Sequence, residues 1–140
     1  MPKEFAVRCA LFCEELRQED DGRLSVISIF HTRFLTGDVP EGMVTGLKLN
    51  VAFLLLLECP PGPYEVVMTF VTPAGKRTPH KATVSVDAST AGLRVPARFS
   101  FSDVTGKEMG PWSLEVTIGR KLIVRVPLRV SYRYRPPITH

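Results

Sequence analysis

Arg94-Val95-Pro96-Ala97-Arg98-Phe99-Ser100-Phe101 and Arg125-Val126-Pro127-Leu128-Arg129-Val130-Ser131-Tyr132 are two copies of one alternating pattern. Successive side chains of a strand point to opposite faces, so each copy places apolar residues on one side and Arg, Pro, Arg and Ser on the other. Each copy is therefore predicted to be a half-buried β-strand. Because Pro donates no ladder hydrogen bond, we expect both copies at a sheet edge, a strand start or a bend.

The same period-two alternation recurs along the rest of the chain. It predicts five strands after residue 62 and three more at residues 4–14, 23–34 and 46–58. Turns rich in Gly, Pro, Asp and Ser separate these segments, which favours antiparallel pairing. About eight short strands in 140 residues predict one domain over residues 1–140, an all-β antiparallel two-sheet β-sandwich of the immunoglobulin-like type.

Two details of this prediction concern single segments and residues. Residues 4–14 also fit a helical stripe, but the tight turn at Asp20-Asp21-Gly22 favours a hairpin and therefore a strand. The inward-facing residues of the later strands are expected to form the core: Phe70, Val84, Phe99, Trp112, Val116, Val126 and Val130.

The N-terminal third carries a family resemblance. Ala10-Leu11-Phe12-Cys13-Glu14-Glu15, followed by Gly22-Arg23-Leu24-Ser25-Val26-Ile27-Ser28-Ile29-Phe30, resembles the opening of a family of small, functionally uncharacterised bacterial proteins. Those proteins begin with a Leu-Phe-Cys-Asp/Glu strand and a Gly-Lys-Leu-Ser-Leu-Ile-Gly-Val-Phe strand, and Ser28 stands where their pattern has Gly. The resemblance implies a bacterial source and a β-sandwich, and it brings no catalytic residue with it.

Composition limits where such a protein would work. We expect the mature chain to begin near Met1, because no leader-like segment opens it. The longest apolar run, residues 51–57, is far shorter than the ~20 residues that span a bilayer. Three cysteines without a Cys-x-x-Cys pair suit a reducing compartment. The sequence therefore predicts a cytoplasmic protein that does not enter a membrane.

No motif in the sequence indicates catalysis, a metal site or a cofactor. On a strand, Cys9 and Cys13 would share a face about 13 Å apart, too far to hold one zinc ion or form a disulfide. His31 is expected to be buried or interfacial, and Cys59 precedes two prolines at a strand end. No nucleophile elbow and no glycine-rich phosphate loop occur in the sequence. We expect a protein that is not an enzyme and has no cofactor.

The strongest sign of a partner is the strand at residues 46–58. One of its faces is apolar throughout, and Ala52, Leu54 and Leu56 make the other face apolar as well. A sandwich strand normally meets water on one side. The sequence does not tell whether these three residues are covered by a loop of the same chain or by another protein chain. The primary hypothesis is an interaction or assembly module that binds a protein partner or itself through this face, as a homo-oligomer.

An alternative hypothesis follows from charge. Residues 71–140 carry twelve Lys and Arg against four Asp and Glu. Their outward arginines could bind an anionic polymer, a nucleic acid or an acidic polysaccharide, or could protect sheet edges from pairing. The residues concerned are Arg94, Arg98, Arg125, Arg129, Arg133 and Arg135.

Overall fold

The protein is all-β. The computed structural model describes residues 5–37, 47–88, 92–104 and 109–134, which include no helix. The described strands are β1 (Ala6–Gln18), β2 (Leu24–Phe30), β3 (Thr32–Gly37), β4 (Leu47–Glu58), β5 (Gly62–Val71), β6 (Arg77–Ala88), β7 (Leu93–Val104), β8 (Gly110–Ile118) and β9 (Lys121–Tyr134). The strand prediction for residues 4–14 is confirmed, because β1 is extended throughout.

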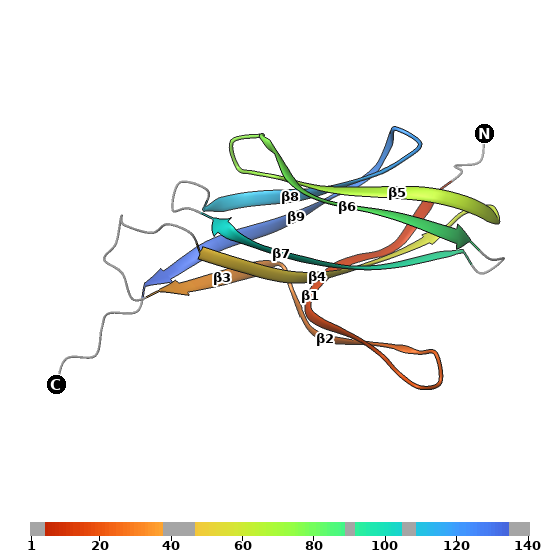
Figure 1. Cartoon of the computed structure of the whole chain (residues 1–140), viewed down its shortest axis with the longest axis horizontal. Helices are drawn as coiled ribbons and strands as arrows, with labels where there is room; N and C mark the ends of the chain where they lie inside the picture. The colour runs from red at the N-terminus through yellow and green to blue at the C-terminus, as the bar shows by residue number, and fades with distance from the viewer. Residues whose placement is uncertain (1–4, 38–46, 89–91, 105–108, 135–140) are drawn as a thin grey trace.

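The strands form two stacked sheets (Figure 1). One has the order β2-β1-β4-β7 and the other the order β3-β9-β8-β5-β6. The series β1-β4-β7 corresponds to strands A, B and E of an immunoglobulin domain, and β9-β8-β5-β6 corresponds to G, F, C and C′ of the variable type. The immunoglobulin-like sandwich expected from the sequence is therefore confirmed, with β2 and β3 lying between strands A and B along the chain.

Two expectations about the first third were wrong. The segment 23–34 forms two strands, so the described residues contain nine strands instead of about eight. His31 alone separates these two strands, and the chain crosses from one sheet to the other at this residue. His31 is exposed, so of the two positions expected for it, burial is ruled out and an interfacial position stays a prediction. Pairing is not wholly antiparallel either, because β3 runs parallel to β9, with Thr32 beside Arg129.

Of the two proline-containing strands, β7 lies at a sheet edge as expected, whereas β9 lies inside its sheet between β3 and β8. β7 is an edge strand, and Pro96 is exposed on it. On β9, the N–H of Arg129 donates to the carbonyl of His31 at the start of β3. Backbone groups two residues apart on a strand point in the same direction. The nitrogen of Pro127 therefore points to the β3 side of β9, at a level where β3 has not yet begun and offers no ladder acceptor. Pro127 therefore removes no ladder hydrogen bond.

Aromatic side chains from both sheets meet in the core at Phe70 of β5. Its ring lies 4.8 Å from that of Phe99 on β7 and 6.1 Å from that of Phe12 on β1. The indole of Trp112, on β8 of the same sheet as Phe70, lies 6.2 Å away in edge contact. Of the predicted core residues, five are buried and two, Val84 and Val126, are half-buried against them.

Truncation of this aromatic cluster should be costly. We expect Phe70→Ala and Trp112→Ala each to lower the free energy of unfolding by about 3 to 5 kcal/mol, because each leaves a cavity between the sheets. Thr83→Ala, at an exposed site on β6, is the matched control and should change it by less than about 0.5 kcal/mol. Urea denaturation followed by circular dichroism measures all three. A cost near 1 kcal/mol for both core variants would contradict this account of the core.

The backbone conformation of Ser28 reverses the faces of β2, so that residues before and after it pack against different parts of the molecule. Its φ is +57°, in the left-handed region that residues other than Gly avoid. Before Ser28, Val26 packs on the outer side of the β4 sheet, whereas after it Phe30 packs against the main core. Residues 26 and 30 would share a face of a regular strand, so the backbone must rotate between them. A Gly, the residue of the family pattern at this place, adopts this conformation without strain.

Ser28→Gly should therefore stabilise the protein. We expect the free energy of unfolding to rise by about 1 kcal/mol, because the left-handed conformation no longer strains a side chain. Ser25→Gly, at an extended position of the same strand, is the control and should lower it by about 0.5 to 1 kcal/mol. Thermal or urea unfolding distinguishes them. Equal destabilisation by both changes would show that Ser28 is not strained.

Candidate interaction surfaces

The β1–β2 hairpin covers the second apolar face of β4. β1 pairs with β4 only as far as Cys13, opposite Ala52, and then continues beside β2 as far as Gln18. From there the hairpin lies on the side of the four-stranded sheet that faces away from the other sheet (Figure 1). Leu16 packs there with Ala52 and Leu54, and the side chains around them are Leu11, Leu24, Val26 and Leu56.

The β1–β2 hairpin, a segment of the same chain, is the cover of the second apolar face of β4, for which the sequence allows either the same chain or another one. Ala52 is 1% exposed and Leu54 is 6% exposed, and Leu56 is half-buried. A segment of the same chain thus accounts for the apolar residues on both faces of β4. In the described chain, Ala52 and Leu54 offer no free surface to a partner.

Two of the predicted anion-binding arginines hold the hairpin in place. Arg98 of β7 donates a hydrogen bond to the carbonyl of Leu16, and Arg94 donates to the carbonyl of Gly22 at 3.4 Å. Both carbonyls belong to backbone beyond Cys13, where β1 no longer pairs with β4. The guanidinium groups of β7 therefore connect the edge of the sheet to the hairpin that lies over it.

Removal of this connection should loosen the hairpin without unfolding the sandwich. Cys13 lies beneath the hairpin, fully buried, and burial raises the pKa of its thiol, so the unreactive neutral form is favoured. In a Cys9→Ser/Cys59→Ser background, we expect Arg94→Ala/Arg98→Ala to speed labelling of Cys13 by a thiol reagent about tenfold, through local opening. Arg129→Ala is the control and should leave the rate unchanged. The same rate in all variants would show that the arginines do not hold the hairpin.

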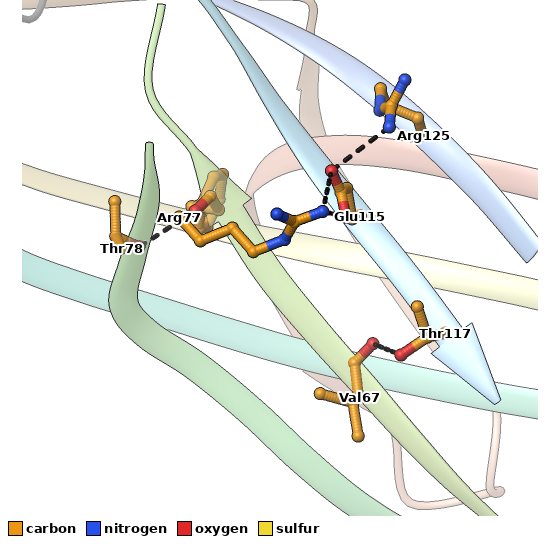
Figure 2. Close-up of polar contacts among 7 residues, drawn as sticks. Val67, Arg77, Thr78, Glu115, Thr117 and Arg125 are labelled. Atoms are coloured by element: carbon orange, nitrogen blue, oxygen red, sulfur yellow. Dashed lines mark hydrogen bonds and ion pairs between the residues drawn. The ribbon is translucent and has the colours of Figure 1, made fainter. Parts of the chain in front are cut away.

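The third predicted arginine is part of an ion-pair cluster on the outer face of the other sheet. Glu115 of β8 points outward yet is only 8% exposed, because two guanidinium groups enclose it. Arg125 of β9 lies 3.2 Å from one carboxylate oxygen, and Arg77 of β6 reaches across β5 to lie 3.2 Å from the other (Figure 2). Sequence reasoning missed Glu115 and Arg77, because 38 residues separate them and no local pattern links them.

The described arginines therefore do not form one anion-binding surface. Arg94 and Arg98 lie on the outer face of the four-stranded sheet, whereas Arg125 and Arg129 lie on that of the five-stranded sheet, the opposite side of the sandwich. Of these four, Arg94, Arg98 and Arg125 each donate a side-chain hydrogen bond within the described residues, and Arg129 is exposed. The side chain of Arg133 and the whole of Arg135 lie outside the described residues.

The described residues contain no metal-binding cluster. No three His, Cys, Asp or Glu side chains among them lie close enough to hold a metal ion. Cys9, Cys13 and Cys59 are free thiols, and burial raises the pKa of Cys59 as it does that of Cys13. Two open hollows of about 260 and 210 Å³ flank the Arg98 side chain. No helix in the described ranges is long and apolar enough to cross a membrane.

The two sides of the sandwich differ in how their edge strands are protected. On one side, β6 and β7 lie in contact, and they carry exposed charged residues, including Lys81, Arg94 and Arg98. On the other side lie β2 and β3, joined only by His31. β2 contains neither a charged residue nor Pro, and its Ile29 is 66% exposed, the highest value among the large apolar residues described.

Comparison with known proteins adds a likeness of overall shape. No family model and no curated protein matches the sequence. Among solved structures, the chain is similar to the crystal structure of an immunoglobulin-like protein from Pseudomonas aeruginosa, with 16% sequence identity and a TM-score of 0.46. The match covers 91% of this chain and 97% of the other. The strand order and register described above carry the immunoglobulin-like assignment of this chain.

Proposed function

We propose that the protein is a non-enzymatic interaction module whose β2 edge pairs with a strand of another protein chain. The observation that carries the proposal is the composition of β2, an edge strand of seven residues without a charge or a proline. Soluble proteins protect free edges with charges, prolines or a covering segment, because unpaired backbone groups are a template for another strand. An unprotected edge is therefore the surface most suited to pairing.

Exposed apolar side chains on β2 also support pairing at this edge. Ile29 extends into solvent, and Ile27 beside it is half-buried. A strand added to β2 would cover both side chains while its backbone satisfies the free edge, so hydrogen bonds and apolar burial act together. The apolar face at Ala52 and Leu54 contributes indirectly, because its packing anchors the hairpin that presents this edge.

Site-specific photo-crosslinking in the native host tests the proposal. A photoreactive amino acid placed at Ile29 should give a discrete protein adduct in living cells. The same group placed at Thr83, exposed on the protected β6 edge, is the matched control and should give none. Adduct formation at both positions alike, or at neither, would overturn the assignment of β2 as the contact edge.

Binding of an anionic polymer is the second candidate. It is supported by the charge of the five-stranded sheet and its turns, where the acidic residues Glu65, Asp87 and Glu115 are outnumbered by Arg33, Lys76, Arg77, Lys81, Arg120, Lys121, Arg125, Arg129 and Arg133. Counterion release makes such binding fall steeply with salt. Retention on an anionic column at ~0.1 M salt that Arg129→Glu abolishes, combined with no adduct at Ile29, would favour this candidate over strand pairing.

A further inference from the structure

The end of the β1–β2 hairpin is joined to the rest of the molecule at one level. β1 leaves β4 at Cys13, and one residue later the register of β1 with β2 is interrupted, because Glu14 and Ser28 are not paired. Ser28 also has its left-handed φ of +57° at this level. The backbone of both strands is therefore irregular along one line across the hairpin, as at a hinge. We call residues 15–27, beyond this line, the arm.

The two sides of the hinge belong to different cores. On the near side, Phe12 and Phe30 pack in the main core between the sheets. On the far side, Leu16 and Val26 of the arm pack in the small core on the outer face of β4. Loss of the small core would leave the contacts of the main core in place, and such a segment opens at a lower free energy than the whole domain.

The polar contacts of the arm are mostly internal. Arg17 lies 3.3 Å from a carboxylate oxygen of Glu15, and the hydroxyl of Ser25 donates to Glu19 at 2.8 Å. Within the described residues, the hydrogen bonds between the arm and the rest of the molecule are the two that guanidinium groups of β7 donate. An open hollow of about 260 Å³ lies between the arm and β7 beside Arg98. The arm is thus one unit with few contacts outside itself.

We infer that the arm is a hinged cover, which opens as one unit about Glu14 and Ser28 while the two sheets stay folded, and which uncovers the apolar outer face of β4. In the closed state Ala52 and Leu54 are 1% and 6% exposed, and in the open state both meet water. The inference goes beyond the function proposed above, because it concerns the covered face of β4 and not the free edge of β2. The arm therefore controls access to this face.

Amide hydrogen exchange, measured residue by residue by nuclear magnetic resonance, tests the hinged cover. In the wild type, the amides of residues 15–18 and 24–27 should share one protection factor, at least about tenfold below that of the amides of β5 and β8. Two matched truncations then separate opening of the arm from unfolding of the sandwich. They are Leu16→Ala in the small core and Leu114→Ala in the main core, where Leu114 is fully buried.

The two truncations should give different patterns. Leu16→Ala destabilises the closed state relative to both the open and the unfolded state, so it should lower the protection of the arm and of β5 by the same factor, at least about tenfold. Leu114 is packed alike in the closed and open states. Leu114→Ala should therefore lower the protection of β5 and β8 and leave that of the arm unchanged. Ile118→Val, a smaller change in the same core, keeps the test decisive if Leu114→Ala does not fold.

A second readout reports the uncovering of β4. Cys13 is fully buried in the small core. In the Cys9→Ser/Cys59→Ser background, its labelling by a thiol reagent should give the same opening constant as the exchange of the arm amides. Labelling that requires a much rarer opening would show that the arm moves without uncovering this face.

The exchange pattern can also contradict the hinge. Equal protection of the arm and β5 in the wild type, or equal loss of protection at both in Leu114→Ala and Ile118→Val, would show that the arm unfolds only together with the sandwich. Either result would overturn the inference, as would a Leu16→Ala variant that does not fold.

Discussion

Contact of Phe70 with aromatic rings of both sheets is the interaction on which the rest of the structure depends. Phe70 meets Phe12 and Phe99 across the sandwich and Trp112 within its own sheet. Edge and offset contacts between rings add to the apolar area that they bury. No disulfide links the sheets among the described residues, since all three cysteines are free. The relative position of the two sheets is therefore set by packing.

The apolar outer face of β4 requires a third layer, the β1–β2 hairpin, outside the four-stranded sheet. A sandwich strand of this kind usually faces water on one side, but Ala52 and Leu54 are apolar on the side away from the core. The hairpin removes that surface from water, and its presence explains why β1 leaves the sheet at Cys13. The resulting molecule has a main core between the sheets and a smaller one outside the four-stranded sheet.

Alternation of apolar residues predicts most of the strands and most of the core, because the period of two is a local property of the chain. It predicts the extended conformation of residues 24–37 equally well, yet gives no sign that His31 divides them between two sheets. The choice of sheet depends on distant partners. Residues 32–37 pair with β9, about a hundred positions later in the chain.

The candidate surfaces were harder to predict for the same reason. Arg98 looks like an outward, solvated side chain in the sequence, but its acceptor is a carbonyl 82 residues away. Glu115 is held by arginines that are 38 and 10 residues distant. The apolar character of Ala52 and Leu54 was visible, and their cover was not, because alternation gives no information about which segment folds back. The free edge of β2 became apparent only once the order of strands was known.

The single residue between β2 and β3 also bears on the mechanical behaviour of the molecule. One residue spans only about 3.5 Å, so the link has no slack. Any sliding of one sheet over the other must pull directly on two ladders, that of β1 with β2 and that of β3 with β9. His31 is thus a short covalent link that transmits shear between the layers to the backbone hydrogen bonds of these two ladders.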